Sequence, residues 1–383
     1  MSALATRAAR TLRPESAREV AEMLAACAAA GERVLPVGAG TAIAAAGAPG
    51  ACDVALVLDG LESVVDYSPE DMTLTVLAGT SLDTIRQTLA PRGQRLPGLP
   101  AGAGTIGGLV ACGWTAPEER EARGTLRERL LGAQIADPAG RLTRSGGRVV
   151  KNVTGYDLHR MHVGAGGAFG VFTELTFRLE PEPEHRAHVT LEAPSADAAG
   201  EAWRWLRAEG PEAAFVCARP GHVLVARVEG DDEPAREAAG ALSAGWGRWG
   251  TVSSREGAAV ATAPTRAARL SVSLRAAPSR VLDLFEEMKG ATAYPQSGEV
   301  LLDLTGEPDD LTARMRALVR RPCRVLDEAP AFLPPDLPRW SADPGALRAL
   351  AKLKRALDPP GILRPGSYSA DALERAAAFF ERA

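Results

Sequence analysis

Three glycine-rich stretches place the strongest limits on how this chain of 383 residues can fold. They cover residues 36–50, 96–115 and 144–179, and in the last one several glycines stand just before an alternating apolar run. Glycine tolerates positive φ and allows another backbone or a ligand to come close. The first two stretches carry almost no charge, and a loop that binds a phosphate with its backbone N–H groups needs no charged side chains. We therefore expect the three stretches to meet around one dinucleotide.

The second stretch contains a literal G-x-G-x-x-G, formed by Gly102, Gly104 and Gly107. A Rossmann fingerprint requires a strand directly before this motif and an acidic residue about 20 positions after it. Pro97 and Gly98 precede it here, and these residues do not form a central strand. We therefore reject the Rossmann interpretation.

Composition argues against several other classes of protein. The net charge of -4 gives no support for nucleic-acid binding, which favours a basic face. The five cysteines form no C-x-x-C, so we expect no iron–sulfur cluster and no metal site in this chain, and free thiols fit a reducing cytoplasm. The uncharged segments are interrupted by proline and glycine, so we expect no transmembrane segment, and we find no apolar region of a signal peptide.

The order of the expected elements indicates an α+β protein with more than one domain. The first 90 residues read as helix, strand, loop, three strands and helix, and residues 181–184 (P-E-P-E) read as a linker. A hairpin is expected from strands at 130–136 and 140–143, with a loop at 145–147. After residue 188, two successive β-α-β-β-α units indicate a ferredoxin-like, duplicated arrangement, and a last amphipathic helix is expected over 346–357.

Four motifs resemble a known family. They are P-V-G-A-G-T at 36–41, P-A-G-A-G-T-I-G-G-L-V-A-C-G at 100–113, G-G-R-V-V-K-N-V-T-G-Y-D-L-H-R-M at 146–161, and L-K-R-A-L-D-P-P-G-I-L-R-P-G at 353–366. They resemble the vanillyl-alcohol-oxidase-like flavoproteins, which have a PCMH-type FAD-binding domain, and within them the FAD-binding E subunits of glycolate oxidases. The resemblance implies a two-subdomain PCMH-type FAD-binding domain over 1–180 and a ferredoxin-like α+β cap domain over 185–340. A C-terminal segment, 346–383, would return to the FAD domain.

The resemblance also implies which residues bind FAD. Backbone groups of two loops would surround the pyrophosphate: Pro36, Gly38, Ala39, Gly40 and Thr41 on one side, and Pro100, Gly104, Thr105, Ile106, Gly107 and Gly108 on the other. Gly170 and Val171 would contact the adenosine end, and Gly155 and Tyr156 would lie near the flavin. A buried pyrophosphate is costly unless its oxygens accept hydrogen bonds, and such loops supply donors. Some family members attach flavin through His or Cys near the first loop; residues 34–51 contain neither, so we predict non-covalent FAD.

The function implied by the resemblance is that of an FAD-binding subunit in a glycolate oxidase or dehydrogenase complex. Such a complex oxidises glycolate, a 2-hydroxy acid, to glyoxylate and passes electrons through flavin to an iron–sulfur partner. A second flavoprotein subunit is implied as another partner. The expected location is the cytoplasm, with any contact to the inner membrane made through the complex.

Catalytic residues are not assigned by the sequence. Catalytic relatives carry an H-x-G-D-G-N-x-H-like segment in the cap, and the nearest text here, 221–232, does not fit it. Two alternatives therefore stay open: a self-sufficient FAD-dependent 2-hydroxy-acid oxidoreductase, and a non-catalytic assembly subunit.

Several other polar residues have both a functional and a structural interpretation. For Lys151 two roles are equally supported: a position near the flavin, and an ion pair with a surface carboxylate. His159 and His162 form H-x-x-H, which is a poor metal site, so we expect a structural role. We expect Cys112 to be a small buried residue behind the second loop. The remaining histidines are expected in solvent: His185, His188 and His222.

Overall fold

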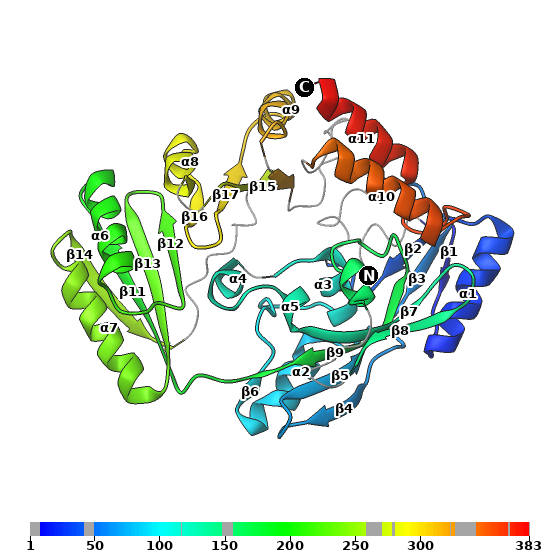
Figure 1. Cartoon of the computed structure of the whole chain (residues 1–383), viewed down its shortest axis with the longest axis horizontal. Helices are drawn as coiled ribbons and strands as arrows, with labels where there is room; N and C mark the ends of the chain where they lie inside the picture. Colours follow the sequence, from blue (N-terminus) through cyan, green and yellow to red (C-terminus); the bar gives the residue numbers. More distant parts are fainter. Residues whose placement is uncertain are drawn as a thin grey trace.

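The computed structural model describes residues 8–41, 50–115, 117–147, 156–257, 270–277, 280–321, 323–325, 342–366 and 368–382. Figure 1 shows an N-terminal part built on two small sheets, a second part built on one large sheet, and two C-terminal helices that lie over the N-terminal part. Within these residues no helix is both long and apolar enough to span a membrane.

The N-terminal sheet is parallel, with strand order β1–β3–β2 (Arg10–Leu12, Val54–Val57 and Val34–Val37). Helix α1 (Ala17–Ala30) packs on it with buried residues at helical spacing. The Ser16 side chain caps the helix by accepting from the Glu19 N–H, and Gly31 ends it at φ 68°. Strand β2 ends at Val37, so the first glycine-rich loop begins at the carboxyl edge of this sheet.

The second sheet is antiparallel and has the order β4–β5–β9–β7–β8. The strands are Val64–Ser68, Thr73–Leu77, Val171–Arg178, Leu130–Ala136 and Leu142–Gly146. Helices α2 (Leu82–Leu89) and α3 (Ile106–Cys112) pack on it, and a 3-10 turn follows α2 at Ala90–Arg92. The central strand β9 pairs with both β5 and β7, although its sequence position is close to neither.

Two local predictions are wrong. The hairpin partner of β7 is β8 at Leu142–Gly146, so the segment predicted as a loop over 145–147 is largely strand, and pairing with β7 continues to Gly146. Residues 106–112 form α3, although a loop was expected. Short helices α4 (Pro117–Arg123) and α5 (Leu126–Arg129) lead from α3 to β7, and a 3-10 turn lies at Leu158–Met161.

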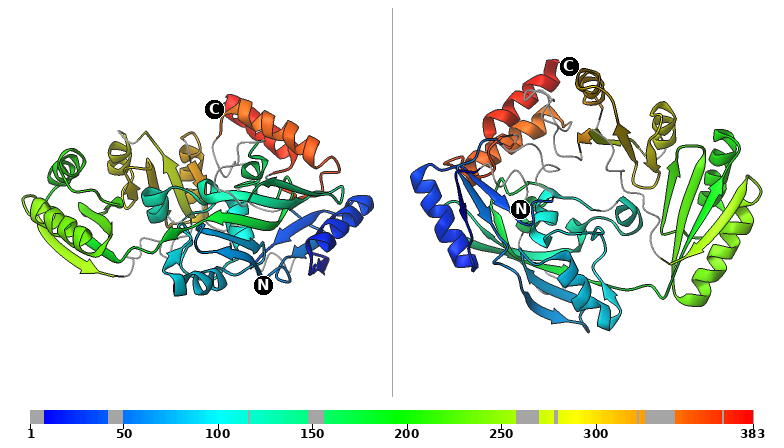
Figure 2. Two further views of the ribbon diagram at one scale, coloured as in Figure 1. Left: turned by 60° about the horizontal axis from the view of Figure 1, so that its bottom comes forward. Right: turned by 180° about the vertical axis from the view of Figure 1, so that it is seen from behind.

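The large sheet has eight strands in the order β14–β11–β13–β12–β16–β17–β15–β18. Its first half contains β11 (His185–Glu192), α6 (Ala196–Ala208), β12 (Phe215–Arg219), β13 (Val223–Gly230), α7 (Asp232–Trp246) and β14 (Thr251–Glu256). Its second half contains β15 (Leu270–Arg275), α8 (Val281–Glu287), β16 (Thr292–Tyr294), β17 (Glu299–Leu304), α9 (Pro308–Leu318) and β18 (Cys323–Val325). Each half is a βαββαβ unit with ferredoxin-like strand order, and the right view of Figure 2 shows the large sheet from behind. We call this sheet with its four helices the cap.

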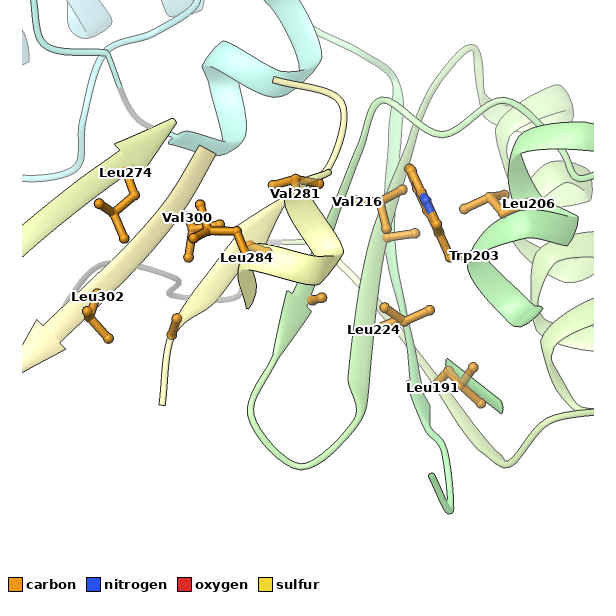
Figure 3. Close-up of a cluster of buried hydrophobic side chains, with 14 of the residues drawn as sticks. Leu191, Trp203, Leu206, Val216, Leu224, Leu274, Val281, Leu284, Val300 and Leu302 are labelled. Carbon is orange, nitrogen blue, oxygen red and sulfur yellow. The ribbon is translucent and has the colours of Figure 1, made fainter. Parts of the chain in front are cut away.

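The two halves of the cap join at their second strands, where Ala218 of β12 pairs with Ala293 of β16. One continuous apolar core lies beneath the helices, and Figure 3 shows Val216 and Leu224 of one half beside Val300 and Leu302 of the other. The mixed α+β fold with a duplicated ferredoxin-like second part, predicted from element order, is confirmed.

Two C-terminal helices return to the N-terminal part. Helix α10 (Pro344–Leu357) packs against α11 (Ala370–Arg382) and, through Leu350, Leu353 and Leu357, against the loop that carries Ala165 and Phe169. The strand-like segment after α10 bridges to β2 at Val34. The exact domain boundaries stay a prediction, because the chain crosses between the parts more than once.

Candidate cofactor-binding site

One open pocket, which we call the cavity, lies where the glycine-rich stretches meet. Most of its wall comes from two loops: Pro36, Gly38, Ala39, Gly40 and Thr41 from the first, and Pro100, Ala103, Gly104, Thr105 and Gly108 from the second. The remaining wall comes from Leu82, Leu109, Ala111, Cys112, Gly166 and Arg364.

Backbone pairing fixes the second loop against the core. The Leu82 N–H donates to the Gly104 carbonyl at 3.0 Å, and the Ile106 N–H donates to the Thr80 carbonyl at 3.0 Å. These two bonds flank Thr105, which lies between them as an isolated bridge partner of Ser81. The loop therefore presents Thr105 and Gly104 to the cavity in a fixed position.

The two loops approach each other too closely for a side chain at Gly38. A Cβ there would lie 2.0 Å from Thr105 Oγ1 and 3.2 Å from Thr105 Cβ. Gly40 has φ of 80°, which disfavours other residue types. Glycine at both positions therefore keeps the space between the loops open.

The cavity wall carries hydrogen-bond donors that the protein does not use. Within the described part of the chain, several amide N–H groups of the wall donate no hydrogen bond: Gly38, Ala39, Gly40, Thr41, Gly104, Thr105 and Gly108. The buried Thr105 Oγ1 likewise has no partner among the described residues. Apart from Thr105, these residues are exposed or half-buried, and their free amides together with the buried Thr105 hydroxyl form a set of donors open to a bound acceptor. An anion such as a diphosphate satisfies such a set.

The third glycine-rich stretch supports the far wall. The Gly166 N–H donates to the Ala111 carbonyl at 2.7 Å, and the Tyr368 hydroxyl donates to the Gly164 carbonyl at 3.0 Å. A Cβ on Gly113 would lie 2.8 Å from the Gly164 Cα, so this loop packs directly on the end of α3. The three stretches and the C-terminal segment thus enclose one site.

Comparison with known proteins identifies the domain that carries this cavity. A family described as "FAD binding domain" matches residues 8–146. The predicted resemblance to PCMH-type FAD-binding flavoproteins and the prediction of FAD as cofactor are therefore confirmed. The free amides and the open space at Gly38 fit a diphosphate, so the residues present suit this cofactor.

Several relatives share this region. Glycolate oxidase subunit GlcE of Escherichia coli is 39% identical over 37% of this chain and 41% of its own length. Glycolate oxidase subunit GlcD of Bacillus subtilis is 28% identical over 49% of this chain and 40% of its own length. The matches thus span about two fifths of these curated relatives. A solved alkyldihydroxyacetonephosphate synthase has a TM-score of 0.64 and 13% identity, covering 93% of this chain and 75% of that chain, which shows a shared fold.

Some residues predicted to bind FAD do not reach the cavity. Ile106 and Gly107 donate their N–H groups to Thr80 and Ala78, so neither amide is available to a phosphate. A Cβ on Gly107 would lie 2.7 Å from the Ala78 Cβ and carbonyl oxygen, so a side chain there would enter the core and not the cofactor space.

The described residues expected near the two ends of FAD do not line this pocket, and their contacts with the cofactor stay a prediction. Gly170 packs against Ile135 and Val171 is in the core beside α1, and neither lines the cavity. Tyr156 is 88% exposed. Gly155 and Lys151 lie outside the described residues.

Sequence reasoning missed one charged residue of the wall, Arg364. It follows α10 in the motif I-L-R-P-G, is 3% exposed, and has φ of 44°. Burial lowers the pKa of its guanidinium, but arginine stays charged in proteins. Cys112 also lines the cavity, and its Sγ donates to the Leu109 carbonyl at 3.1 Å. Non-covalent attachment of FAD stays a prediction.

One face of the cap sheet packs on the four cap helices, and the opposite face contacts the FAD-binding domain through α4. Ala122 packs on the apolar side chains of this face: Phe215, Cys217, Val225, Tyr294 and Leu301. Glu119 pairs with Arg227 at 2.8 Å, and Arg120 pairs with Glu299 at 2.7 Å. Glu121 accepts from the backbone N–H groups of residues 296 and 297, each at 2.6 Å.

A buried carboxylate, Glu229, lies at the centre of this contact. Four arginines surround it at 2.7–3.2 Å: Arg95, Arg123, Arg186 and Arg227. Burial alone would raise the pKa of Glu229, but the arginines, led by Arg227, hold it at about 2. This network joins the FAD-binding domain to the cap.

The histidines differ from expectation. His185 and His188 are buried in β11, where a solvated position was expected, whereas His222 is exposed. Burial, together with the nearby arginines, Arg227 first, lowers the pKa of His188 to about 4. His162 packs on Phe172, and burial lowers its pKa to about 4 as well. Among the described residues no group of three or more His, Cys, Asp or Glu side chains could hold a metal ion.

Proposed function

We propose that this chain is an FAD-binding subunit of a complex that oxidises glycolate, or a closely related 2-hydroxy acid, to the 2-oxo acid. The similarity to the glycolate oxidase subunits named GlcE and GlcD supports this proposal. A further relative, named D-2-hydroxyglutarate dehydrogenase, points to the same substrate class. The partners we propose are a second flavoprotein subunit and an iron–sulfur subunit. The complex would work in the cytoplasm or at the inner face of the membrane through those partners.

The observation that carries the proposal is the cavity whose wall presents backbone amides without a hydrogen-bond acceptor. In the same chain, α4 already covers the face of the cap sheet that lies opposite the cap helices. When bound, FAD supplies two-electron chemistry and can release the electrons one at a time. The residues of this chain would bind the diphosphate with the amides of Gly38–Thr41 and of Gly104, Thr105 and Gly108. The Glu229 network would hold the cap against the domain and exclude water from the cofactor.

Substrate oxidation in this chain would need a base for the hydroxyl proton, and general bases work best with a pKa near the working pH. His188 is the buried histidine of the cap face, beside Phe215. With a pKa of about 4 and Arg227 nearby, it is a weak base. The ion pairs of α4 occupy the surrounding surface. We therefore favour an electron-relay role over substrate oxidation.

The alternatives make different predictions in one reconstitution experiment. Glycolate-dependent dye reduction is measured with the chain alone, with the purified partner subunits alone, and with both. A fourth sample contains the partners and Gly38→Val, whose side chain would collide with Thr105 and block the space between the loops. Gly240→Val is the matched control, because a Cβ at this helical position meets no atom within 4 Å.

Activity only in the mixture, lost with Gly38→Val and kept with Gly240→Val, is the expected result. Dye reduction by the chain alone would replace the relay proposal with a self-sufficient oxidoreductase. Full activity of the mixture with a folded, flavin-free Gly38→Val chain would make this an assembly subunit.

A further inference from the structure

Among the described residues that line the FAD cavity, Arg364 alone carries a charge. The two loops contribute amides and small apolar side chains, whereas a diphosphate brings two negative charges. Amide donors lower the cost of burying these charges without neutralising them. A buried guanidinium in the same wall supplies the opposite charge and a planar set of donors suited to phosphate oxygens.

Backbone hydrogen bonds hold Arg364 beside the first loop. The Val34 N–H donates to the Ile362 carbonyl at 2.7 Å, and the Arg364 N–H donates to the Val34 carbonyl at 2.8 Å. The segment thus extends the sheet next to β2, whose end carries the Gly38–Thr41 loop. Arg364 itself has φ of 44°, a conformation that costs free energy for a residue with a side chain. Strain of this kind persists where the surroundings enforce it.

A buried ion pair enforces it. Lys354 of α10 has a side chain 3% exposed, and its Nζ donates to Asp358 Oδ2 at 2.6 Å and to the Ala168 and Leu363 carbonyls at 2.7 Å each. Asp358 in turn accepts from the Ile362 and Leu363 N–H groups, at 3.1 and 2.8 Å. Every donor of the ammonium group is used, and the pair fixes the residue that precedes Arg364.

The same ammonium group ties together two walls of the cavity. Ala168 belongs to the loop that contains Gly166, and α10 packs on that loop through Leu353. Lys354 therefore fixes the third glycine-rich stretch and the Arg364 segment relative to each other. This link also holds Leu363, the neighbour of Arg364, which is the one charged residue among the described residues of the cavity wall.

We propose that Arg364 binds the diphosphate of FAD and that the Lys354–Asp358 pair positions it for this role. Arg364 is the binding residue, and Lys354 acts through it. The inference rests on FAD binding by this chain. It is independent of the proposed relay role, because its tests measure ligand binding without partner subunits or substrate.

The first test measures binding of FAD and of ADP to the flavin-free chain by fluorescence quenching and competition. ADP contains the diphosphate without the isoalloxazine. Arg364→Met is expected to weaken FAD and ADP alike, on the order of 100-fold, and Arg364→Lys to recover part of this. The ³¹P resonances of bound FAD should shift in Arg364→Lys. Arg355→Met, on an exposed α10 position paired with Glu374, is the matched control and should change neither affinity.

A different pattern would overturn the assignment. If Arg364→Met weakened FAD but not ADP, and lowered the flavin reduction potential, Arg364 would serve the ring and not the diphosphate. Unchanged affinity for both ligands would remove it from the site. Should Arg364→Met fail to fold, the ³¹P spectrum and ADP affinity of Arg364→Lys decide between these outcomes.

The second test is a double-mutant cycle for Lys354. Lys354→Met is expected to weaken FAD binding about tenfold in the wild-type background and to add no further loss to Arg364→Met. Additive losses would show that Lys354 acts on FAD binding independently of Arg364. If Lys354→Met is unstable, Lys354→Met/Asp358→Asn removes the unpaired buried carboxylate and permits the same comparison.

Discussion

Thr105→Val is predicted to stabilise the flavin-free chain while weakening its affinity for FAD. The Thr105 side chain is 8% exposed, and its hydroxyl has no partner among the described residues. It also makes no capping hydrogen bond to α3, so the helix loses nothing when the hydroxyl is removed. A buried hydroxyl without a hydrogen bond costs about 1–3 kcal/mol, and valine keeps the shape without that cost.

The effect of Thr105→Val on FAD binding is unfavourable, opposite to its effect on the stability of the flavin-free chain. A hydrogen bond from a hydroxyl to a charged phosphate contributes about 1.5–3 kcal/mol, which is about 10- to 150-fold in the dissociation constant. At a free FAD concentration 100 times the wild-type dissociation constant, binding stabilises the wild type by about 2.7 kcal/mol. A variant with 100-fold weaker binding gains only about 0.4 kcal/mol at that concentration.

The assay is urea unfolding with and without FAD, together with a direct titration by flavin fluorescence. Thr173→Val is the matched control, because the Thr173 hydroxyl is buried but donates to the Gln134 carbonyl and side-chain oxygen, at 3.2 and 3.0 Å. That variant should lose stability and keep its FAD affinity. A Thr105→Val chain that is destabilised and binds FAD like the wild type would refute the idea that the hydroxyl faces the cofactor.

Three further outcomes are expected. Gly107→Ala should lower the free energy of unfolding by about 1–3 kcal/mol through its contact with Ala78, while calorimetry finds FAD affinity within threefold of wild type. Glu229→Gln should lower the free energy of unfolding by about 3–5 kcal/mol at most in urea melts at pH 7, because it removes a buried carboxylate shared by four arginines, each of which keeps one other carboxylate partner. His162 and His188 have folded pKa values near 4 and unfolded values near 6.5, so the unfolded chain takes up protons first. The contribution of these two histidines to the free energy of unfolding should be fully present above pH 6.5 and should decrease as the pH drops towards 4. In melts at pH 7 and 4.5, His162→Phe should reduce this decrease by about 3 kcal/mol at most.

Regular elements of the cap were predictable because each one carries its own periodic pattern. The order of two β-α-β-β-α units after residue 188 indicated the duplication. Strands β14 and β16 carry little sequence pattern of their own, for different reasons. β14 is an edge strand, almost wholly exposed and therefore without apolar alternation, and β16 has only three residues. Pairing to a neighbour, which the sequence does not show, defines both.

The site was predictable only where glycine itself is the signal. Gly38 and Gly107 look alike in the sequence, since both stand in uncharged glycine-rich motifs. The structure separates their causes: a Cβ at Gly38 would meet Thr105 across the cavity, and a Cβ at Gly107 would meet Ala78 in the core. Arg364 was not singled out, because the resemblance implied that residues 346–383 return to the FAD domain but did not indicate which of their side chains lines the wall.

The recognised FAD-binding domain, residues 8–146, is therefore not a complete binding unit. Strand β9 lies between β5 and β7, so a chain ending at residue 146 would leave the antiparallel sheet without its central strand. Gly166 and Arg364 complete the cavity from still later positions, and Lys354 joins the segments that carry them. Formation of the cofactor site thus requires the chain to fold through the cap and return. We therefore expect FAD binding to depend on the C-terminal segment as well as on the two glycine-rich loops.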